Sequence, residues 1–135
     1  MRRGNIKCYL VDLALRNAIL RIQDSLLKDA KTLGYYAENL VFNALKKWEG
    51  TVNIGYFREK ESEVDFIVHL GAGKYLPIEV KYKETIRDTE LRTIKNFCKR
   101  LNCPFGIVVS KNWDDFGRKD NLFYMPLTQF LLLFD

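Results

Sequence analysis

The chain has 135 residues, the size of one ordinary domain, and such a domain buries roughly two thirds of its unfolded surface. Its 47% hydrophobic and 29% charged residues are typical of a globular protein and argue against a largely disordered chain. The formal charge of +5 permits a nucleic-acid partner without requiring one. Residues 1–100 carry 19 basic and 13 acidic side chains, whereas residues 101–135 carry 3 and 4, so we expect any polyanion-facing surface in the first hundred residues.

Cysteine and histidine usage excludes several kinds of site. Cys8, Cys98 and Cys103 are odd in number and lack a C-x-x-C spacing, so they indicate neither a disulfide framework nor a thiolate zinc site. His69 is the only histidine, which excludes multi-histidine metal sites. No apolar run approaches the roughly 18 residues that span a bilayer, and the first residues lead into no signal-peptide core. We therefore expect a cytoplasmic protein with no membrane partner.

The first third of the chain predicts two helices. Residues 8–22 begin extended and continue as a short helix with Asp12 as its N-cap, and residues 23–33 form a polar connection, so that residues 1–33 are a helical lead-in. The clearest helix covers residues 34–48 and ends at Gly50. Its apolar side chains recur at the helical spacing, namely Ala37, Leu40, Val41, Ala44, Leu45 and Trp48.

The remainder predicts strands around one further helix. Residues 51–57, 63–70 and 75–82 are strands, and the last two form a hairpin through the glycine-rich turn 71–74. A helix over residues 88–101 ends before Pro104, and residues 105–110 form a strand covered on both faces. The apolar face of the helix over 88–101 comprises Leu91, Ile94, Phe97, Cys98 and Leu101. We expect a polar loop over 111–121 and a C-terminal helical segment over 126–134 that begins with Pro126, completing a single domain with its core in residues 34–110.

Charged side chains in the predicted hairpin indicate a site. Because side chains alternate along a strand, Glu79 and Lys81 share one face, about 6 to 7 Å apart. Asp65 lies in the paired strand, in a run that is otherwise apolar through Val68, and the hairpin can bring it beside Glu79. Ionised groups in such apolar strands are costly without a partner or a metal.

The two carboxylates favour a hard divalent cation. Adjacent carboxylates repel each other, and Mg²⁺ or Mn²⁺ bound through carboxylate oxygens and waters would relieve that repulsion. Such an ion can lower the pKa of a bound water and stabilise charge on a phosphodiester. Lys81 is then placed to act on the attacking water or on the developing charge, and Glu38 lies one position from the apolar stripe of its helix, near the helix–sheet boundary.

These residues resemble a known superfamily. The helix with Gly34-Tyr35-Tyr36-Ala37-Glu38-Asn39, the strand with Glu63-Val64-Asp65-Phe66 and the strand with Ile78-Glu79-Val80-Lys81 resemble PD-(D/E)XK nucleases. The sequence is similar, more narrowly, to the C-terminal nuclease-like domain that follows an AAA-type P-loop ATPase domain in many archaeal and bacterial proteins. Supporting stretches are Val11-Asp12-Leu13-Ala14-Leu15-Arg16-Asn17-Ala18 and Met125-Pro126-Leu127, so the resemblance covers nearly the whole chain.

The resemblance implies a restriction-endonuclease-like α/β core, with the order α-β-β-β-α-β and a mixed sheet flanked by helices. It implies that Asp65 and Glu79 are metal ligands, that Lys81 is the catalytic lysine and that Glu38 has an accessory catalytic role. Two features depart from the pattern. Val64 replaces the proline before the first acidic residue, and the chain lacks a Walker A loop, because Tyr75 follows Gly73-Lys74. We therefore expect no ATP binding by this chain itself.

Other readings of the same residues remain open. Glu79 and Lys81 are alternatively a same-face ion pair on a solvated sheet, worth about 0 to 1 kcal/mol, and Glu38 is alternatively a solvated helix residue. Candidate contacts to a DNA backbone flank the site or follow the helix over 88–101, namely Arg58, Lys60, Lys83, Arg92, Lys95 and Lys99. A solvated charged face is the alternative for the helix.

Three functions are consistent with these patterns. The first is a Mg²⁺- or Mn²⁺-dependent DNA nuclease that serves an ATPase, either as its downstream domain or as its partner. The second is a non-catalytic DNA-binding or regulatory module of such an ATPase. The third is a free-standing endonuclease similar to junction resolvases, which would act as a homodimer. The sequence leaves open the DNA specificity, endo against exo cleavage, the oligomeric state and whether the chain is a fragment of a longer ATPase.

Overall fold

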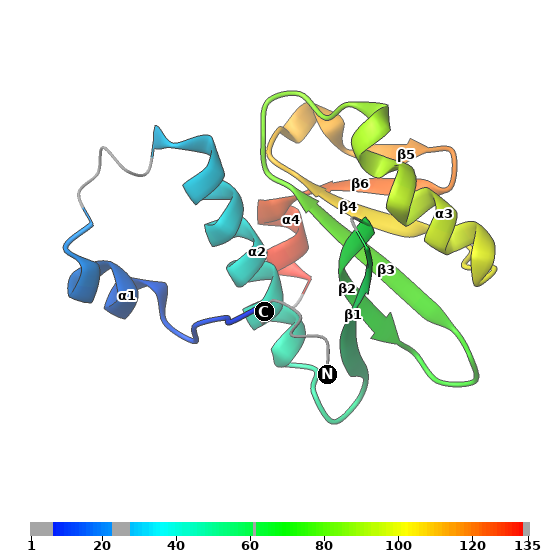
Figure 1. The fold of residues 1–135 in the computed structure, drawn as a ribbon, viewed down its shortest axis with the longest axis horizontal. Helices are drawn as coiled ribbons and strands as arrows, with labels where there is room; N and C mark the ends of the chain where they lie inside the picture. Colours follow the sequence, from blue (N-terminus) through cyan, green and yellow to red (C-terminus); the bar gives the residue numbers. More distant parts are fainter. Residues whose placement is uncertain (1–6, 23–27, 61, 134–135) are drawn as a thin grey trace.

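The computed structural model describes residues 7–22, 28–60 and 62–133, and it has a six-stranded mixed sheet with helices on both faces (Figure 1). The elements in chain order are α1 (Leu13–Leu20), α2 (Ala30–Lys46), β1 (Asn53–Glu59), β2 (Ser62–His69), β3 (Tyr75–Lys81), the 3-10 helix η2 (Asp88–Leu91), α3 (Arg92–Arg100), β4 (Gly106–Ser110), the 3-10 helix η3 (Trp113–Asp115), β5 (Gly117–Lys119), β6 (Leu122–Pro126) and α4 (Leu127–Leu132). The expected α/β class is confirmed. The predictions for residues 23–27 and 134 lie outside the described residues.

The sheet joins an antiparallel half to a parallel half. Its strand order is β1-β2-β3-β4-β6-β5, in which β1, β2 and β3 run antiparallel, β3, β4 and β6 run parallel, and β5 is antiparallel to β6. The predicted hairpin is present: the Lys74 N–H donates to the Gly71 carbonyl at 2.9 Å in the turn between β2 and β3. The strand that carries Glu79 and Lys81 therefore lies at the junction of the two halves.

The last part of the chain differs from the expectation. The segment over 111–121, predicted as a polar loop, contains η3 and β5, and residues 122–126 form β6 rather than the approach to a helix. β6 pairs with β4 from Gly106↔Leu122 to Ser110↔Pro126. Pro126 is the last residue of the strand, where its missing N–H is tolerated, and it is also the N-cap of α4.

Both predicted long helices have shifted ends. α2 begins four residues earlier than predicted, because Asp29 caps it by accepting the Thr32 N–H at 2.8 Å. It ends at Lys46, so Trp48 lies beyond the apolar stripe and is 46% exposed. The helix predicted over 88–101 divides into η2 and α3, and Leu101 is exposed beyond its end.

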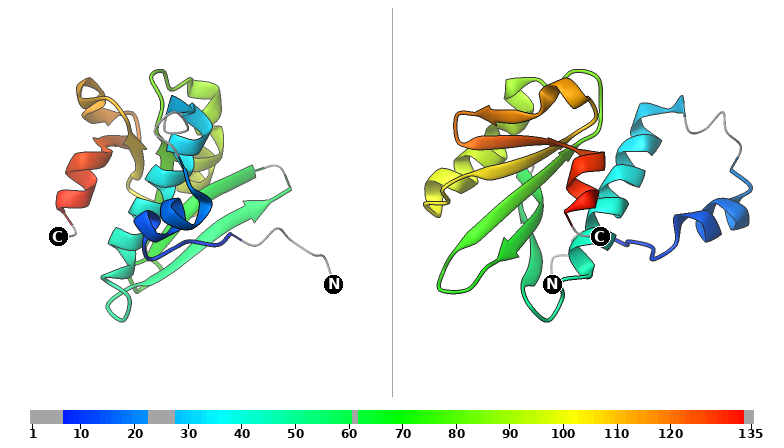
Figure 2. Two further views of the ribbon diagram at one scale, coloured as in Figure 1. Left: turned by 90° about the vertical axis from the view of Figure 1, so that its left-hand side faces the viewer. Right: turned by 180° about the vertical axis from the view of Figure 1, so that it is seen from behind.

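Helices cover the two faces of the sheet (Figures 1 and 2). α2 and α4 pack on one face through a cluster that includes Val41, Phe66 and Phe130, and α3 packs on the other face through a cluster that includes Ile94 and Val108. All five residues of β4 are buried between these layers, as the apolar pattern of residues 105–110 predicted.

The predicted cap of α1 is confirmed, although the helix itself is peripheral. Asp12 accepts the N–H groups of Ala14 at 2.7 Å and Leu15 at 3.1 Å. α1 contains no buried residue and lies apart from the sheet, on the far side of α2 (Figure 1). In the described part of the chain, no helix is both long enough and apolar enough to cross a membrane.

Candidate active site

A bulge in β2 sets the position of Asp65. Between the pairs Gly55↔Ile67 and Phe57↔Val64, β1 advances by two residues and β2 by three, so β2 carries one additional residue there. Such bulges re-aim side chains and are frequent beside active sites. The Asp65 Oδ2 accepts the N–H of Val80 at 2.9 Å. The carboxylate thus bonds to the backbone of β3 directly between Glu79 and Lys81.

The pair Glu79 and Lys81 is largely buried. Glu79 is 6% exposed; its Oε1 accepts a hydrogen bond from the Lys81 ammonium, and its Oε2 has no hydrogen-bond partner among the described residues. Burial raises the pKa of Glu79, and the charge of Asp65 raises it further, while Lys81 opposes both. Burial lowers the pKa of Lys81, but the charge and the hydrogen bond of Glu79 outweigh it, so that this pKa is raised. The carboxyl is therefore in an environment that disfavours its charge.

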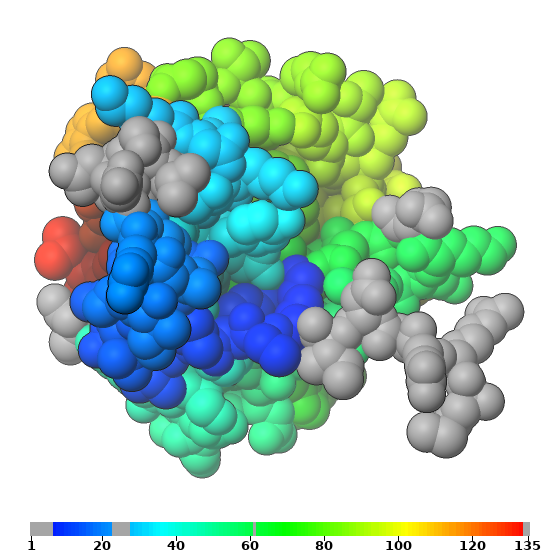
Figure 3. Space-filling view, turned by 60° about the vertical axis from the view of Figure 1, so that its left-hand side comes forward, coloured from blue at the N-terminus to red at the C-terminus, as the bar shows by residue number. Residues whose placement is uncertain are grey.

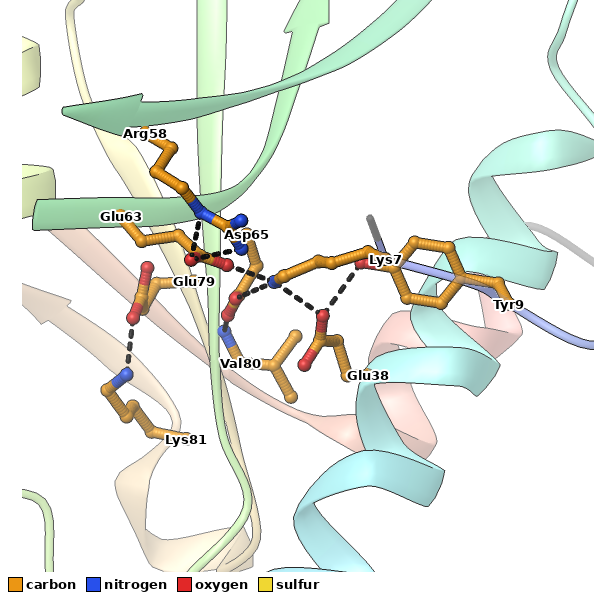
Figure 4. Close-up of polar contacts among 9 residues, drawn as sticks. All are labelled: Lys7, Tyr9, Glu38, Arg58, Glu63, Asp65, Glu79, Val80 and Lys81. Carbon is orange, nitrogen blue, oxygen red and sulfur yellow. Dashed lines mark hydrogen bonds and ion pairs between the residues drawn. The ribbon is translucent and has the colours of Figure 1, made fainter. Parts of the chain in front are cut away.

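Glu38 is brought to Asp65 through a residue that sequence reasoning missed. The Lys7 Nζ lies 2.7 Å from Glu38 Oε1 and 3.0 Å from Asp65 Oδ1, and it also forms an ion pair with Glu63 (Figure 4). Burial lowers the pKa of Lys7, but the charge of Asp65 and the hydrogen bonds to the three carboxylates outweigh burial and raise it. One ammonium group therefore links carboxylates from α2 and β2.

Two further side chains complete this cluster. The Tyr9 hydroxyl donates to Glu38 Oε1 at 2.7 Å, and burial together with this bond raises the pKa of Tyr9. The Arg58 guanidinium lies 2.7 Å from Glu63 Oε2. Burial raises the pKa of Glu63, but Lys7 and Arg58 outweigh it, so this pKa is lowered. Arg58, a candidate DNA contact, is thus bound to a carboxylate of the site.

The segment that contains Lys7 is attached to α2. We refer to residues 7–11 as the N-terminal strap. Asn39 donates to the Leu10 carbonyl at 2.7 Å and accepts the Leu10 N–H at 2.8 Å, while Asn43 donates to the carbonyls of Leu10 and Val11. In the space-filling view the strap (dark blue) lies between α2 (cyan) and the green strands (Figure 3). This attachment places Lys7 over the carboxylates.

The other candidate DNA contacts divide into two groups. Lys83 pairs with Glu90, and Lys95 lies 2.5 Å from Asp88 and 3.4 Å from Asp120. Three others are exposed and form no ion pair within the described residues, namely Lys60, Arg92 and Lys99.

The residues that sequence reasoning missed differ in whether the sequence contained a signal for their role. Glu63 stands two residues before Asp65 in the same strand, so the alternation of side chains was a usable signal. Lys7 is 58 positions from Asp65 and lies in a segment with no periodic pattern, so nothing in the sequence indicated its contact. Asn39 stands beside Glu38 in the helix motif, and its buried side-chain amide holds the strap, a role that the motif did not indicate.

The donor chemistry of the site fits a hard divalent cation. Mg²⁺ is commonly held by one or two carboxylates together with substrate phosphates and retained waters. Asp65 and Glu79 supply two such carboxylates, and Glu79 Oε2 is a buried acceptor that has no hydrogen-bond partner in the part of the chain that the structure describes. Within the described residues, no group of three or more Asp, Glu, His or Cys side chains is arranged to hold a metal. The fit is therefore to an open two-carboxylate site rather than to a closed cage.

Fold and geometry together define an α/β domain with an acidic cluster at the middle of a mixed sheet. The family model of DUF4143, a domain of unknown function, matches residues 33–130, and the chain belongs to this family. The match is compatible with a domain linked to AAA-type ATPases, and it assigns no activity. No curated protein and no solved structure matches the chain.

Proposed function

We propose that this domain is a Mg²⁺- or Mn²⁺-dependent DNA nuclease of the PD-(D/E)XK type, which hydrolyses phosphodiester bonds and works with an AAA-type ATPase. The observation that supports it best is the meeting of Asp65, Glu79 and Lys81 where the antiparallel and parallel halves of the sheet join. Glu79 is buried, and one of its oxygens has no hydrogen-bond partner in residues 7–22, 28–60 and 62–133, which is costly for a carboxylate that has only a structural role.

Each residue has a role in this proposal. Asp65 and Glu79 would hold the cation, which when bound supplies positive charge beside the phosphate and acidifies a water. The Lys81 ammonium orients the attacking water and stabilises the negative charge that develops on the phosphate oxygens. Water adds to phosphorus, the bond from phosphorus to one ester oxygen breaks, and that oxygen leaves with a proton. Glu38, which shares the Lys7 ammonium with Asp65 in the structure, would support the metal ligands as an accessory residue.

Plasmid cleavage tests this function. The purified 135-residue chain is incubated with supercoiled DNA and MgCl₂ or MnCl₂, and we expect nicked or linear product that EDTA abolishes. Asp65→Ala and Lys81→Ala each remove a group that acts at the reacting phosphate, so we expect each to lower the rate at least about 100-fold. Lys46→Ala removes an exposed ion pair between the last residue of α2 and Glu49, and serves as the matched control. Cleavage that persists unchanged in both site variants overturns the assignment.

A second function is favoured by one specific observation. Lys7 already forms ion pairs with Glu38, Glu63 and Asp65, as a structural ion cluster would require. A non-catalytic DNA-binding or regulatory module of an ATPase is consistent with that arrangement. Calorimetry separates the two functions: Mn²⁺ binding that disappears in Asp65→Ala supports the nuclease, whereas DNA binding without any Mn²⁺ binding supports the module.

A further inference from the structure

One ammonium group lies where the acidic side chains of the candidate site converge. Lys7 bonds to Glu38, Glu63 and Asp65 at the same time, and two of these carboxylates belong to the proposed catalytic set (Figure 4). Its side chain is 21% exposed, so the group is reachable from solvent. The chain therefore supplies its own cation at the place where the proposed function requires one.

The balance of charges allows one such cation and disfavours two. The carboxylates of the cluster are Glu38, Glu63, Asp65 and Glu79, and the cations that bond to them are Lys7, Arg58 and Lys81. Removal of one cation leaves close carboxylates that repel each other. A divalent ion added beside Lys7 on the same oxygens would meet strong repulsion at a separation of a few Å. Occupation by the ammonium and occupation by a metal ion therefore exclude each other.

Lys7 can leave without undoing the strap. The strap is attached to α2 by the two hydrogen bonds between Asn39 and Leu10, three residues along the chain from Lys7. Tyr9 stacks on Phe42 at a centroid distance of 4.3 Å, which adds a second attachment. Because the Lys7 ammonium stands on a flexible four-carbon stem, it can swing into solvent while the backbone of the strap stays in place.

Lys7 also leaves one requirement of the site unmet. It forms no ion pair with Glu79, whose Oε2 is buried and has no hydrogen-bond partner among the described residues. A hard cation that binds Asp65 together with Glu79 would give this oxygen a partner. The buried oxygen is an observation independent of the carboxylates around Lys7, and it points to a ligand other than the ammonium.

We propose that Lys7 is a built-in counter-ion that occupies the cation position of the site, and that a divalent metal ion must displace its ammonium from Asp65 and Glu38 in order to bind. The inference rests on the proposed metal site and adds the residue that competes with the ion. The apparent metal affinity of the domain is then set by Lys7 as well as by the carboxylates.

Titration calorimetry with MnCl₂ on the full chain tests the competition. Lys7→Gln removes the competing charge, so we expect it to bind Mn²⁺ at least tenfold more tightly than the native sequence. Lys7→Arg keeps a cation and is expected to remain near the native affinity. Lys46→Gln removes the last lysine of α2 from an exposed pair with Glu49 and should leave the affinity unchanged. Asp65→Ala should abolish the binding.

The outcomes separate the inference from the proposed function. Equal affinity in Lys7→Gln and the native chain, with binding lost in Asp65→Ala, overturns the role of Lys7 and leaves the metal site intact. Absence of Mn²⁺ binding in every variant overturns both. If Lys7→Gln is unfolded in EDTA, circular dichroism on addition of MnCl₂ decides: refolding supports the exchange of one cation for the other, and failure to refold overturns it.

Discussion

Glu79 illustrates how a single buried carboxylate depends on its partner. Its Oε1 accepts from Lys81, its Oε2 is unpaired among the described residues, and the charge of Asp65 lies nearby. Removal of one member of such a pair leaves a buried charge without compensation, whereas replacement of both members by uncharged groups is often neutral or stabilising. The pair is therefore expected to add little to the free energy of unfolding relative to an uncharged pair, and this can be measured.

We predict that Lys81→Met destabilises the fold by about 1–3 kcal/mol, because Glu79 loses its hydrogen-bond partner. The double variant Glu79→Gln with Lys81→Met should recover most of that loss, since no buried anion remains. Urea unfolding at pH 7 measures both free energies. Lys46→Met, in a more exposed pair, should change stability by less than about 0.5 kcal/mol. A double variant as unstable as the sum of its single variants would contradict the prediction.

At the scale of residues, the sequence predicted the pieces of the site better than their connections. Asp65, Glu79 and Lys81 could be placed together because strand alternation and a short hairpin are local properties. Lys7 could not, since its contact with Asp65 spans 58 positions and depends on the attachment of the strap to α2. The bulge that turns Asp65 toward β3 likewise follows from the pairing with β1, which no single strand encodes.

At the scale of elements, the strand β6 was not predicted, because both of its faces are at least half-buried and its sequence shows no alternation of polar and apolar residues. β6 has only five residues, Leu122–Pro126, in which buried and half-buried positions alternate, and it is followed directly by α4. A short apolar run of this kind cannot be told from a helix segment by periodicity alone, and Pro126 favoured the start of a helix. Longer patterns were reliable: α2 and the hairpin of β2 and β3 were predicted within a few residues of their ends.

The start of the η2–α3 segment depends on a carboxylate whose charge is strongly stabilised. Glu90 accepts the Arg87 N–H at 3.0 Å and bonds to Lys83. The bond to Lys83 is the largest cause that lowers the pKa of Glu90, from its ordinary value of 4.5 to about 2. Because the folded pKa is depressed, the unfolded chain takes up the proton first as the pH falls. The stabilisation is therefore present above about pH 4.5 and is lost as the pH falls toward about 2.

We predict that Glu90→Gln lowers stability at pH 7 by at most about 1 kcal/mol, because the pair with Lys83 is partly exposed. The difference from the native chain should shrink as the pH falls from 4.5 and should vanish only below about pH 2, where Glu90 is protonated in both states. Unfolding by urea at a series of pH values measures it. A difference that stays constant down to pH 2 would show that Glu90 acts through packing or its backbone bond rather than through its charge.

At the scale of the whole molecule, the net charge of +5 does not show which basic side chains already form ion pairs with carboxylates of the protein. Arg58 is bound to Glu63, Lys83 is bound to Glu90, and Lys95 faces two aspartates. A cation that is already paired must break its bond to reach a phosphate, and its carboxylate partner then repels the DNA. The surface that attracts a polyanion is expected to consist mainly of exposed cations that have no partner.

This distribution predicts which residues govern DNA affinity. Lys60, Arg92 and Lys99 are exposed and form no ion pair in the described part of the chain, so replacing all three by alanine should lower the slope of log affinity against log salt by about 2–3. The double variant of Lys83 and Lys95 should change that slope by less than about 1. Fluorescence anisotropy with a labelled duplex, in EDTA between 50 and 200 mM KCl (about the range over which such slopes are resolved), measures both. An equal loss in the two variants would mean that the ion pairs open on binding, and that DNA contacts the paired cations as readily as the free ones.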